Sequence, residues 1–209
     1  MEIGIPLDLL QAEFEDTCLR LKNVLTTGRC TLALAVEISV SEIARQYNKF
    51  SIIEEIAILE GSSSRESVTK QAERLKRIPI KNIWHKHHFQ ARFIPKNLSK
   101  DKFVEEALTR AFTRFDLDDP IPRQILDHAA YEMVIGTFER LQSRRALTGE
   151  WIIFQRENGK NEYITLGTHG ENMDLLINRI NSHQASGTWP RKDNDDRWQI
   201  PQIAIRADE

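Results

Sequence analysis

Asn158 and Gly159 separate two β-rich runs, Trp151–Glu157 and Lys160–Leu166, and leave this part of the chain little choice of conformation. A two-residue hairpin loop places both of its residues at positive φ, which Asn and Gly accept at low steric cost. The sequence therefore predicts an antiparallel hairpin across 151–166. With two residues in the loop, the register pairs Glu157 with Lys160, Phe154 with Tyr163 and Ile153 with Ile164.

The chain ahead of the hairpin has the apolar periodicity of helices. Residues 31–48 fit a strand as well, but the alanines in this stretch favour a helix. Ser51 with Glu54 and Ser63 with Glu66 have the spacing of capping boxes, which satisfy the first amides of a helix. We therefore expect about five to six helices ahead of the hairpin, over 7–25, 31–48, 52–60, 63–79, 99–115 and, after a turn that ends at Pro122, up to about Leu147.

Behind the hairpin the sequence predicts a helix that begins near Met173 and a third strand over 200–206. A strand–helix–strand crossover makes that third strand parallel to 160–166. An isolated hairpin is marginal in water, so we expect it to pack on the helices. The predicted fold is α+β: a mainly helical region, 1–148, shares one core with a β-hairpin–helix–strand module, 149–209.

Composition narrows the class of protein. The chain has a net charge of -2, 40% hydrophobic residues and two cysteines, Cys18 and Cys30, which make neither a disulfide framework nor a metal-binding knuckle. It contains no apolar run of about 20 residues, and its acidic N-terminus is unlike a signal peptide. We therefore expect a cytoplasmic globular protein with no membrane segment, no metal and no cofactor.

Positive charge is concentrated between residues 62 and 102, where eleven Lys and Arg residues stand against three Asp and Glu residues. The same stretch contains His85, His87 and His88, interleaved with aromatic residues and cations. A basic segment with stacking rings is typical of proteins that bind single-stranded nucleic acid, and it predicts one exposed patch over 65–102. The competing interpretation is a solvated helix face that pairs with acidic helices elsewhere in the chain.

Three histidines in four residues supply groups that donate or accept a proton near cellular pH. The local cluster offers at most two imidazoles on one side, so a zinc site with three or more ligands is not expected. General acid–base chemistry on a phosphodiester needs two such groups and one cation to stabilise the charge on phosphorus. The candidate catalytic residues are His85, His87, His88, His169 and Arg92.

The stretch Leu166–Asn172 turns from a predicted strand into a predicted helix. The first turn of a helix leaves amides free and carries the positive end of the helix dipole, so it attracts phosphate or carboxylate groups. The simpler alternative is that Thr168 or Asn172 only caps the helix. We expect this turn to meet residues 84–96 in one phosphate pocket. The candidate phosphate-binding residues are Lys81, Lys86, Lys96, Thr168 and Gly170.

Two functions of different class remain. The first is a nucleic-acid-directed protein that favours RNA, and in its sharper form a small metal-independent ribonuclease of the toxin or defence kind. The second is a non-catalytic interaction protein whose basic face meets an acidic partner or another copy of the chain. Degradation of RNA in EDTA separates the two hypotheses.

Overall fold

The structure, a computed structural model, describes residues 5–76, 78–99, 106, 109, 123–147 and 149–189. The chain divides into two compact units. The first unit combines Met1–Glu66, Ala72–His88 and Glu150–Glu209, and the second combines Ser67–Gln71 and Phe89–Gly149. The chain before the longer segment of the second unit and the chain after it therefore belong to the same unit.

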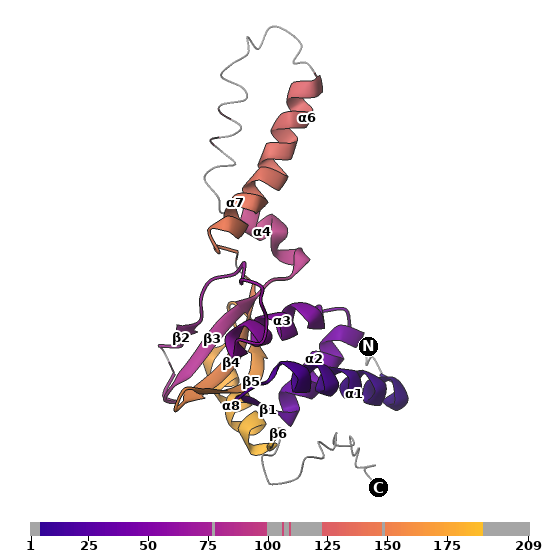
Figure 1. Cartoon of the computed structure of the whole chain (residues 1–209), viewed down its shortest axis with the longest axis vertical. Helices are drawn as coiled ribbons and strands as arrows, with labels where there is room; N and C mark the ends of the chain where they lie inside the picture. The colour runs from indigo at the N-terminus through magenta and orange to yellow at the C-terminus, as the bar shows by residue number, and fades with distance from the viewer. Residues whose placement is uncertain are drawn as a thin grey trace. The chain divides into compact units, whose positions relative to one another are not determined.

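A mixed sheet forms the centre of the first unit (Figure 1). Its strands are β1 (Arg29–Thr31), β2 (Glu73–Arg74), β3 (Ile83–His88), β4 (Glu150–Glu157), β5 (Lys160–Gly167) and β6 (Thr188–Trp189). Their order across the sheet is β2-β3-β4-β5-β1-β6. β1 and β5 pair in parallel, and the other neighbouring strands are antiparallel.

Helices pack on both faces of this sheet and confirm the α+β class. They are α1 (Leu7–Val24), α2 (Leu32–Ile43), α3 (Lys49–Glu60) and α8 (Met173–Ala185). On one face, α1, α2 and α3 bury their apolar stripes against Ile152 and Phe154 of β4. On the other face, α8 packs against Ile83 and Ile153. Side chains from distant parts of the sequence therefore pack together on the α1–α3 face of the sheet.

The hairpin is confirmed, with Asn158 and Gly159 at φ values of 50° and 77°. The predicted pairs of Glu157 with Lys160 and Phe154 with Tyr163 are also confirmed. The third pair is wrong, because a bulge next to Ile153 places this residue opposite Thr165 instead of Ile164. The extra residue returns Leu166 to the sheet face that packs on α1, α2 and α3, where it is buried.

Two of the predicted helix starts are wrong. Helix α3 begins at Lys49, because the Asn48 side chain accepts hydrogen bonds from the amides of Phe50 and Ser51 and thereby caps the helix. The predicted helix over 63–79 is absent from the described part of this stretch. There the Ser63 hydroxyl donates to Glu54 at 2.7 Å and accepts from the Arg65 amide at 3.1 Å, which closes a turn. The chain then enters β2.

The C-terminal residue of α3, Glu60, ties three parts of the first unit together. Its carboxylate accepts hydrogen bonds from the backbone amides of Thr27 and Gly28 at 3.1 and 2.8 Å and from the Tyr163 hydroxyl at 2.8 Å. Burial alone would raise the pKa of Glu60, but these hydrogen bonds outweigh it and lower the pKa. A Cβ at Gly28 would lie 2.4 Å from the Glu60 carboxylate, so the close approach requires glycine.

Helices make up most of the described part of the second unit. It contains α4 (Ile94–Ser99), α6 (Arg123–Tyr131), a π-helical turn (Glu132–Gly136) and α7 (Thr137–Ser143). The predicted helix that follows Pro122 is therefore helical from Arg123 to Ser143. The predicted helix over 99–115, apart from Ser99, Glu106 and Thr109, and the predicted strand over 200–206 lie outside the described residues.

The longer segment of the second unit, Phe89–Gly149, connects β3 to β4. The residues on either side of it, His88 and Glu150, are direct partners in the antiparallel ladder. Within the described residues, no helix is both long and apolar enough to cross a membrane.

Candidate functional site

The register of three strands brings residues from distant parts of the sequence into one row. His85 and His87 are two positions apart on β3, so both imidazoles lie on the same face of the sheet. His87 lies opposite Trp151 of β4, and Trp151 lies opposite Gly167 of β5. The turn that follows Gly167 therefore carries His169 to the same end of the sheet.

Four rings form what we call the histidine–tryptophan cluster: His85, His87, Trp151 and His169. The imidazoles of His87 and His169 are stacked, with centroids 5.2 Å apart and planes inclined by 25°. The His85 ring lies 5.5 Å from the His87 ring. The Trp151 ring contacts all three imidazoles, with centroid distances of 4.8 Å to His169, 5.0 Å to His85 and 6.3 Å to His87.

Exposure to solvent differs strongly within the cluster. His169 is exposed, His85 and Trp151 are half-buried, and His87 is 4% exposed. A ligand that approaches from solvent therefore meets His169 first, with His87 behind it. The indole nitrogen of Trp151 is buried and has no hydrogen-bond acceptor among the described residues. Such an unsatisfied donor costs roughly 1–3 kcal/mol of folding free energy.

Carboxylates of the chain itself hold the turn that carries His169. The His169 amide donates to Glu150 at 2.7 Å, and the Thr168 amide donates to Glu171 at 3.3 Å. The Arg179 guanidinium in turn donates to Glu171 at 2.8 Å. Because both amides already have anionic acceptors, the turn positions the imidazole and does not offer these two amides to a phosphate.

The start of α8 has a cap of its own. The Asn172 side chain accepts hydrogen bonds from the amides of Asp174 and Leu175 at 2.8 and 3.4 Å. The simpler alternative, in which this residue caps the helix, is therefore the observed one. Gly170 lies in the turn at a φ of 87°, and a side chain added there would meet no atom within 4 Å.

Lys86 and His88 alternate with the cluster histidines and lie on the opposite face of β3. The Lys86 ammonium is 3.0 Å from the Glu55 carboxylate of α3, and the lysine is only 3% exposed. Burial lowers the pKa of Lys86, although the charge of Glu55 acts in the opposite direction. His88 has no exposed surface, and its ring lies 5.3 Å from the Tyr47 ring. The prediction that Lys86 belongs to one exposed basic patch is therefore wrong.

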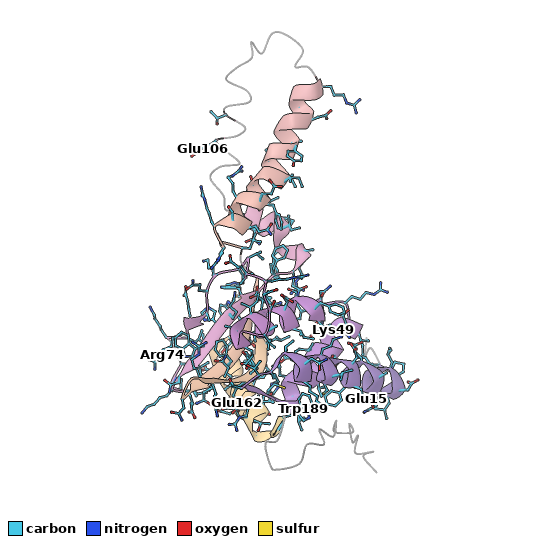
Figure 2. All side chains as sticks on the ribbon, in the orientation of Figure 1. Glu15, Lys49, Arg74, Glu106, Glu162 and Trp189 are labelled. Atoms are coloured by element: carbon cyan, nitrogen blue, oxygen red, sulfur yellow. The ribbon has the colours of Figure 1, made fainter. Side chains whose placement is uncertain are left out.

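The other predicted cations lie apart along the chain. Lys81 is exposed in the turn ahead of β3, and Arg74 extends from β2 at the edge of the sheet (Figure 2). Arg92 and Lys96 belong to the second unit, where the exposed Arg92 guanidinium lies 5.0 Å from the Phe93 ring centroid. Lys96 is a residue of α4. The histidine–tryptophan cluster is thus built from residues of the first unit.

Neither cysteine is a candidate nucleophile. Cys18 and Cys30 are buried free thiols. Burial raises the pKa of Cys18 to about 12 and also raises that of Cys30, so both thiols stay protonated at neutral pH. In the part of the chain that the structure describes, no group of three or more His, Cys, Asp or Glu side chains is placed to hold a metal ion.

Sequence reasoning missed two residues of this region, Trp151 and Glu150. The hairpin register places Trp151 at the far end of β4, but its contact with the histidines depends on the pairing of β3 with β4. Residues 83–88 carry no apolar alternation that would predict a strand there. A tryptophan at the start of a hairpin strand is the one signal that the sequence offered.

Comparison with known proteins found no match: no protein-family model, no curated protein and no solved structure matches the chain.

Proposed function

We propose that the protein cleaves RNA and that the histidine–tryptophan cluster is the site of the reaction. The observation that supports this proposal is a group of three imidazoles from two distant segments, in which the His87 ring lies 5.2 Å from the His169 ring and 5.5 Å from the His85 ring. Two imidazolium charges at this distance repel each other, so a state with one protonated and one neutral ring in the cluster is favoured. That state contains a proton donor and a proton acceptor together.

The proposed reaction uses the 2′-hydroxyl of RNA as the nucleophile. A neutral imidazole takes the proton of this hydroxyl while its oxygen forms a bond to phosphorus. The bond from phosphorus to the 5′-oxygen breaks, and an imidazolium donates its proton to that oxygen. The products are a 2′,3′-cyclic phosphate and a free 5′-hydroxyl. DNA lacks the 2′-hydroxyl and is not a substrate for this reaction.

The exposure of each ring suggests its role. His169 is exposed and His85 is half-buried, so we assign the two proton transfers to these residues. His87 contacts both rings and is almost fully buried, so we assign it to positioning them. Trp151 and His169 offer ring surface on which an unpaired base can stack.

The proposal draws on fewer residues than the sequence predicted. Lys86 and His88 lie on the opposite face of β3 and are left out. Arg92 and Lys96 belong to the second unit, so the proposal leaves the stabilisation of charge on phosphorus to the protonated imidazole of the cluster and does not depend on these cations. A cytoplasmic location and a toxin or defence role are part of the same proposal, because an RNA-cleaving protein acts where RNA is present.

The test is cleavage of a single-stranded RNA oligonucleotide in EDTA by the purified protein. We expect His169→Asn to lower the cleavage rate at least about 100-fold, the usual contribution of a positioned acid or base. The matched control is His183→Asn, because His183 lies on α8 with its Nδ1 3.2 Å from the Ile164 carbonyl and outside the cluster. This control is expected to keep the wild-type rate. Mass spectrometry of the products should show the 2′,3′-cyclic phosphate.

Two results contradict the proposal. One is RNA that stays intact with the wild-type protein under these conditions. The other is cleavage that His169→Asn leaves unchanged, which would indicate a contaminating nuclease or a site elsewhere in the chain. A DNA oligonucleotide of the same sequence should remain intact throughout.

A further inference from the structure

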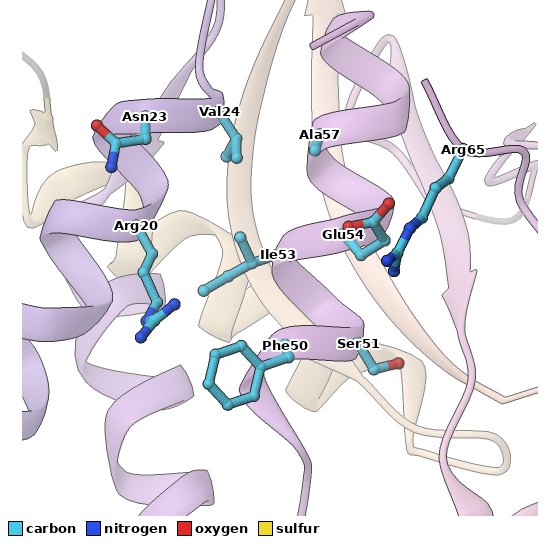
Figure 3. A pocket seen from close by; sticks show the side chains of 9 residues that line it. All are labelled: Arg20, Asn23, Val24, Phe50, Ser51, Ile53, Glu54, Ala57 and Arg65. Atoms are coloured by element: carbon cyan, nitrogen blue, oxygen red, sulfur yellow. The ribbon is translucent and has the colours of Figure 1, made fainter. Parts of the chain in front are cut away.

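A groove lies between α1 and α3 of the first unit, far along the sequence from the histidine–tryptophan cluster (Figure 3). Its volume is about 530 Å³, which suits several side chains of a bound segment better than a single ion. Apolar side chains form much of its lining. Ile53 and Ala57 of α3 are 7% and 4% exposed, whereas Phe50 is 51% exposed. A large exposed aromatic ring beside a buried apolar surface is a common feature of binding sites.

Arginines stand on two sides of this groove. Figure 3 shows Arg20 of α1 on one side and Arg65, which follows α3, on the other. Phe50, Ile53 and Glu54 lie between them, with the Glu54 side chain next to Arg65 in this view. The Arg20 guanidinium lies 4.6 Å from the Phe50 ring centroid, and its Nε donates to Asp16 at 2.7 Å. These contacts hold Arg20 and Phe50 in place before any partner arrives, which lowers the entropy cost of binding.

The balance of charge in the groove favours an acidic partner. Glu54 is the one carboxylate among the residues that line it, and this carboxylate already accepts a hydrogen bond from the Ser63 hydroxyl at 2.7 Å. Among the ion pairs of the described residues, none engages the Arg65 guanidinium. The groove therefore presents two guanidinium groups, one of them without an ion-pair partner in the described chain, beside an apolar floor.

We infer that this groove binds an acidic amphipathic segment of a partner protein. An apolar side chain of that segment packs on Ile53 and Phe50, and carboxylates on either side of it pair with Arg20 and Arg65. Guanidinium groups bind carboxylates through paired hydrogen bonds, so they fix the direction of the segment as well as its charge. The apolar floor favours a peptide over a nucleic acid, whose backbone offers phosphates but no aliphatic side chains.

The test uses a fluorescein-labelled amphipathic peptide with leucines on one helical face and glutamates on the other. We expect saturable binding to the full-length protein by fluorescence anisotropy. Arg65→Glu and Phe50→Ala should each weaken binding at least tenfold. The matched control is Arg74→Glu, because Arg74 is an exposed arginine on β2 that does not line the groove and undergoes the same change of charge. The control should bind like the wild-type protein.

Several outcomes would overturn the inference. They are the absence of saturable binding, equal binding of a leucine–lysine peptide, and equal weakening by Arg74→Glu. Displacement of the peptide by a single-stranded RNA oligonucleotide would assign the groove to phosphates and overturn it as well. The proposed RNA cleavage involves none of these residues, so Arg65→Glu should leave the cleavage rate unchanged. The two proposals therefore fail or survive independently.

Discussion

The two faces of β3 place chemically similar side chains in opposite environments. On one face, His85 is half-buried against Trp151, and the buried His87 stacks on the exposed His169. On the other face, Lys86 and His88 are sealed beneath α3, where the lysine pairs with a buried glutamate. His87 therefore shares its surroundings with the distant His169 and not with its sequence neighbours Lys86 and His88, because successive side chains of a strand point to opposite faces of the sheet.

The largest expected effect comes from breaking the ion pair on the sealed face. Lys86→Met leaves the Glu55 carboxylate buried without its cation, so we expect the free energy of unfolding to fall by about 3–5 kcal/mol. The double variant Lys86→Met with Glu55→Leu should recover most of this loss, because it removes both charges. Urea unfolding of the three proteins measures the difference. Equal stability of the single and double variants would show that the buried pair is not the cause.

The ion pair of Lys86 with Glu55 gives the stability of the wild-type protein a dependence on pH that the Lys86→Met variant lacks. Burial lowers the pKa of Lys86 below its ordinary value of 10.5, so the folded protein releases this proton at a pH where the unfolded chain still binds it. The unfolded state then holds more protons, and the stability contributed by this group rises with pH in the window just below 10.5. Subtracting the curve of the variant from that of the wild type isolates this rise.

A smaller difference in stability is expected between substitutions of histidine on the two faces of the sheet. His88→Ala empties a fully buried position and should lower the free energy of unfolding by about 2–4 kcal/mol, as for other large buried side chains. His169→Ala removes an exposed ring and should change it by less than about 0.5 kcal/mol. Thermal and urea unfolding of both variants test this. Similar losses in the two variants would mean that the cluster contributes to the core as much as the sealed face does.

A small effect is also expected for Trp151→Phe. A phenyl ring keeps much of the aromatic contact with the three imidazoles, and the substitution removes an indole N–H that has no acceptor among the described residues. The lost packing and the relieved donor offset each other, so we expect a change within about 1 kcal/mol. A larger loss in urea unfolding would indicate an acceptor for the indole nitrogen, such as an ordered water molecule.

Local signals allowed parts of the fold to be predicted. Asn158 and Gly159 fix the turn by their own backbone preferences, so the hairpin and its first pairs follow from the sequence. The bulge beside Ile153 does not, because it arises from the packing of Leu166 on helices more than a hundred residues away. The spacing of Ser63 and Glu66 predicted a helix, but the Ser63 hydroxyl hydrogen-bonds to Glu54 of the preceding helix.

The site was harder to predict than the fold, for a physical reason. A strand such as Trp84–His88, whose own side chains are polar or aromatic on both faces, shows no alternation of apolar and polar residues. The contact between the histidines of this segment and the turn at His169 was predicted from the complementary chemistry of the two segments, without knowledge that residues 83–88 form a strand. The same prediction also named His88 and Lys86, because only a strand shows that these two side chains point to the opposite face.

The pairing of His88 with Glu150 has a consequence for how this protein can change over evolution. Direct partners in an antiparallel ladder lie about 5 Å apart, so the long segment between them leaves the sheet and returns to it at a single position. The entropy of closing such a segment grows only with the logarithm of its length. The sheet therefore bears little cost when the segment lengthens, shortens or is exchanged. Phe89–Gly149 is therefore an insertion between β3 and β4 whose length can vary while the sheet keeps its pairing, and its one β-bridge to a segment outside it among the described residues joins Leu147 to Thr69 of the same unit.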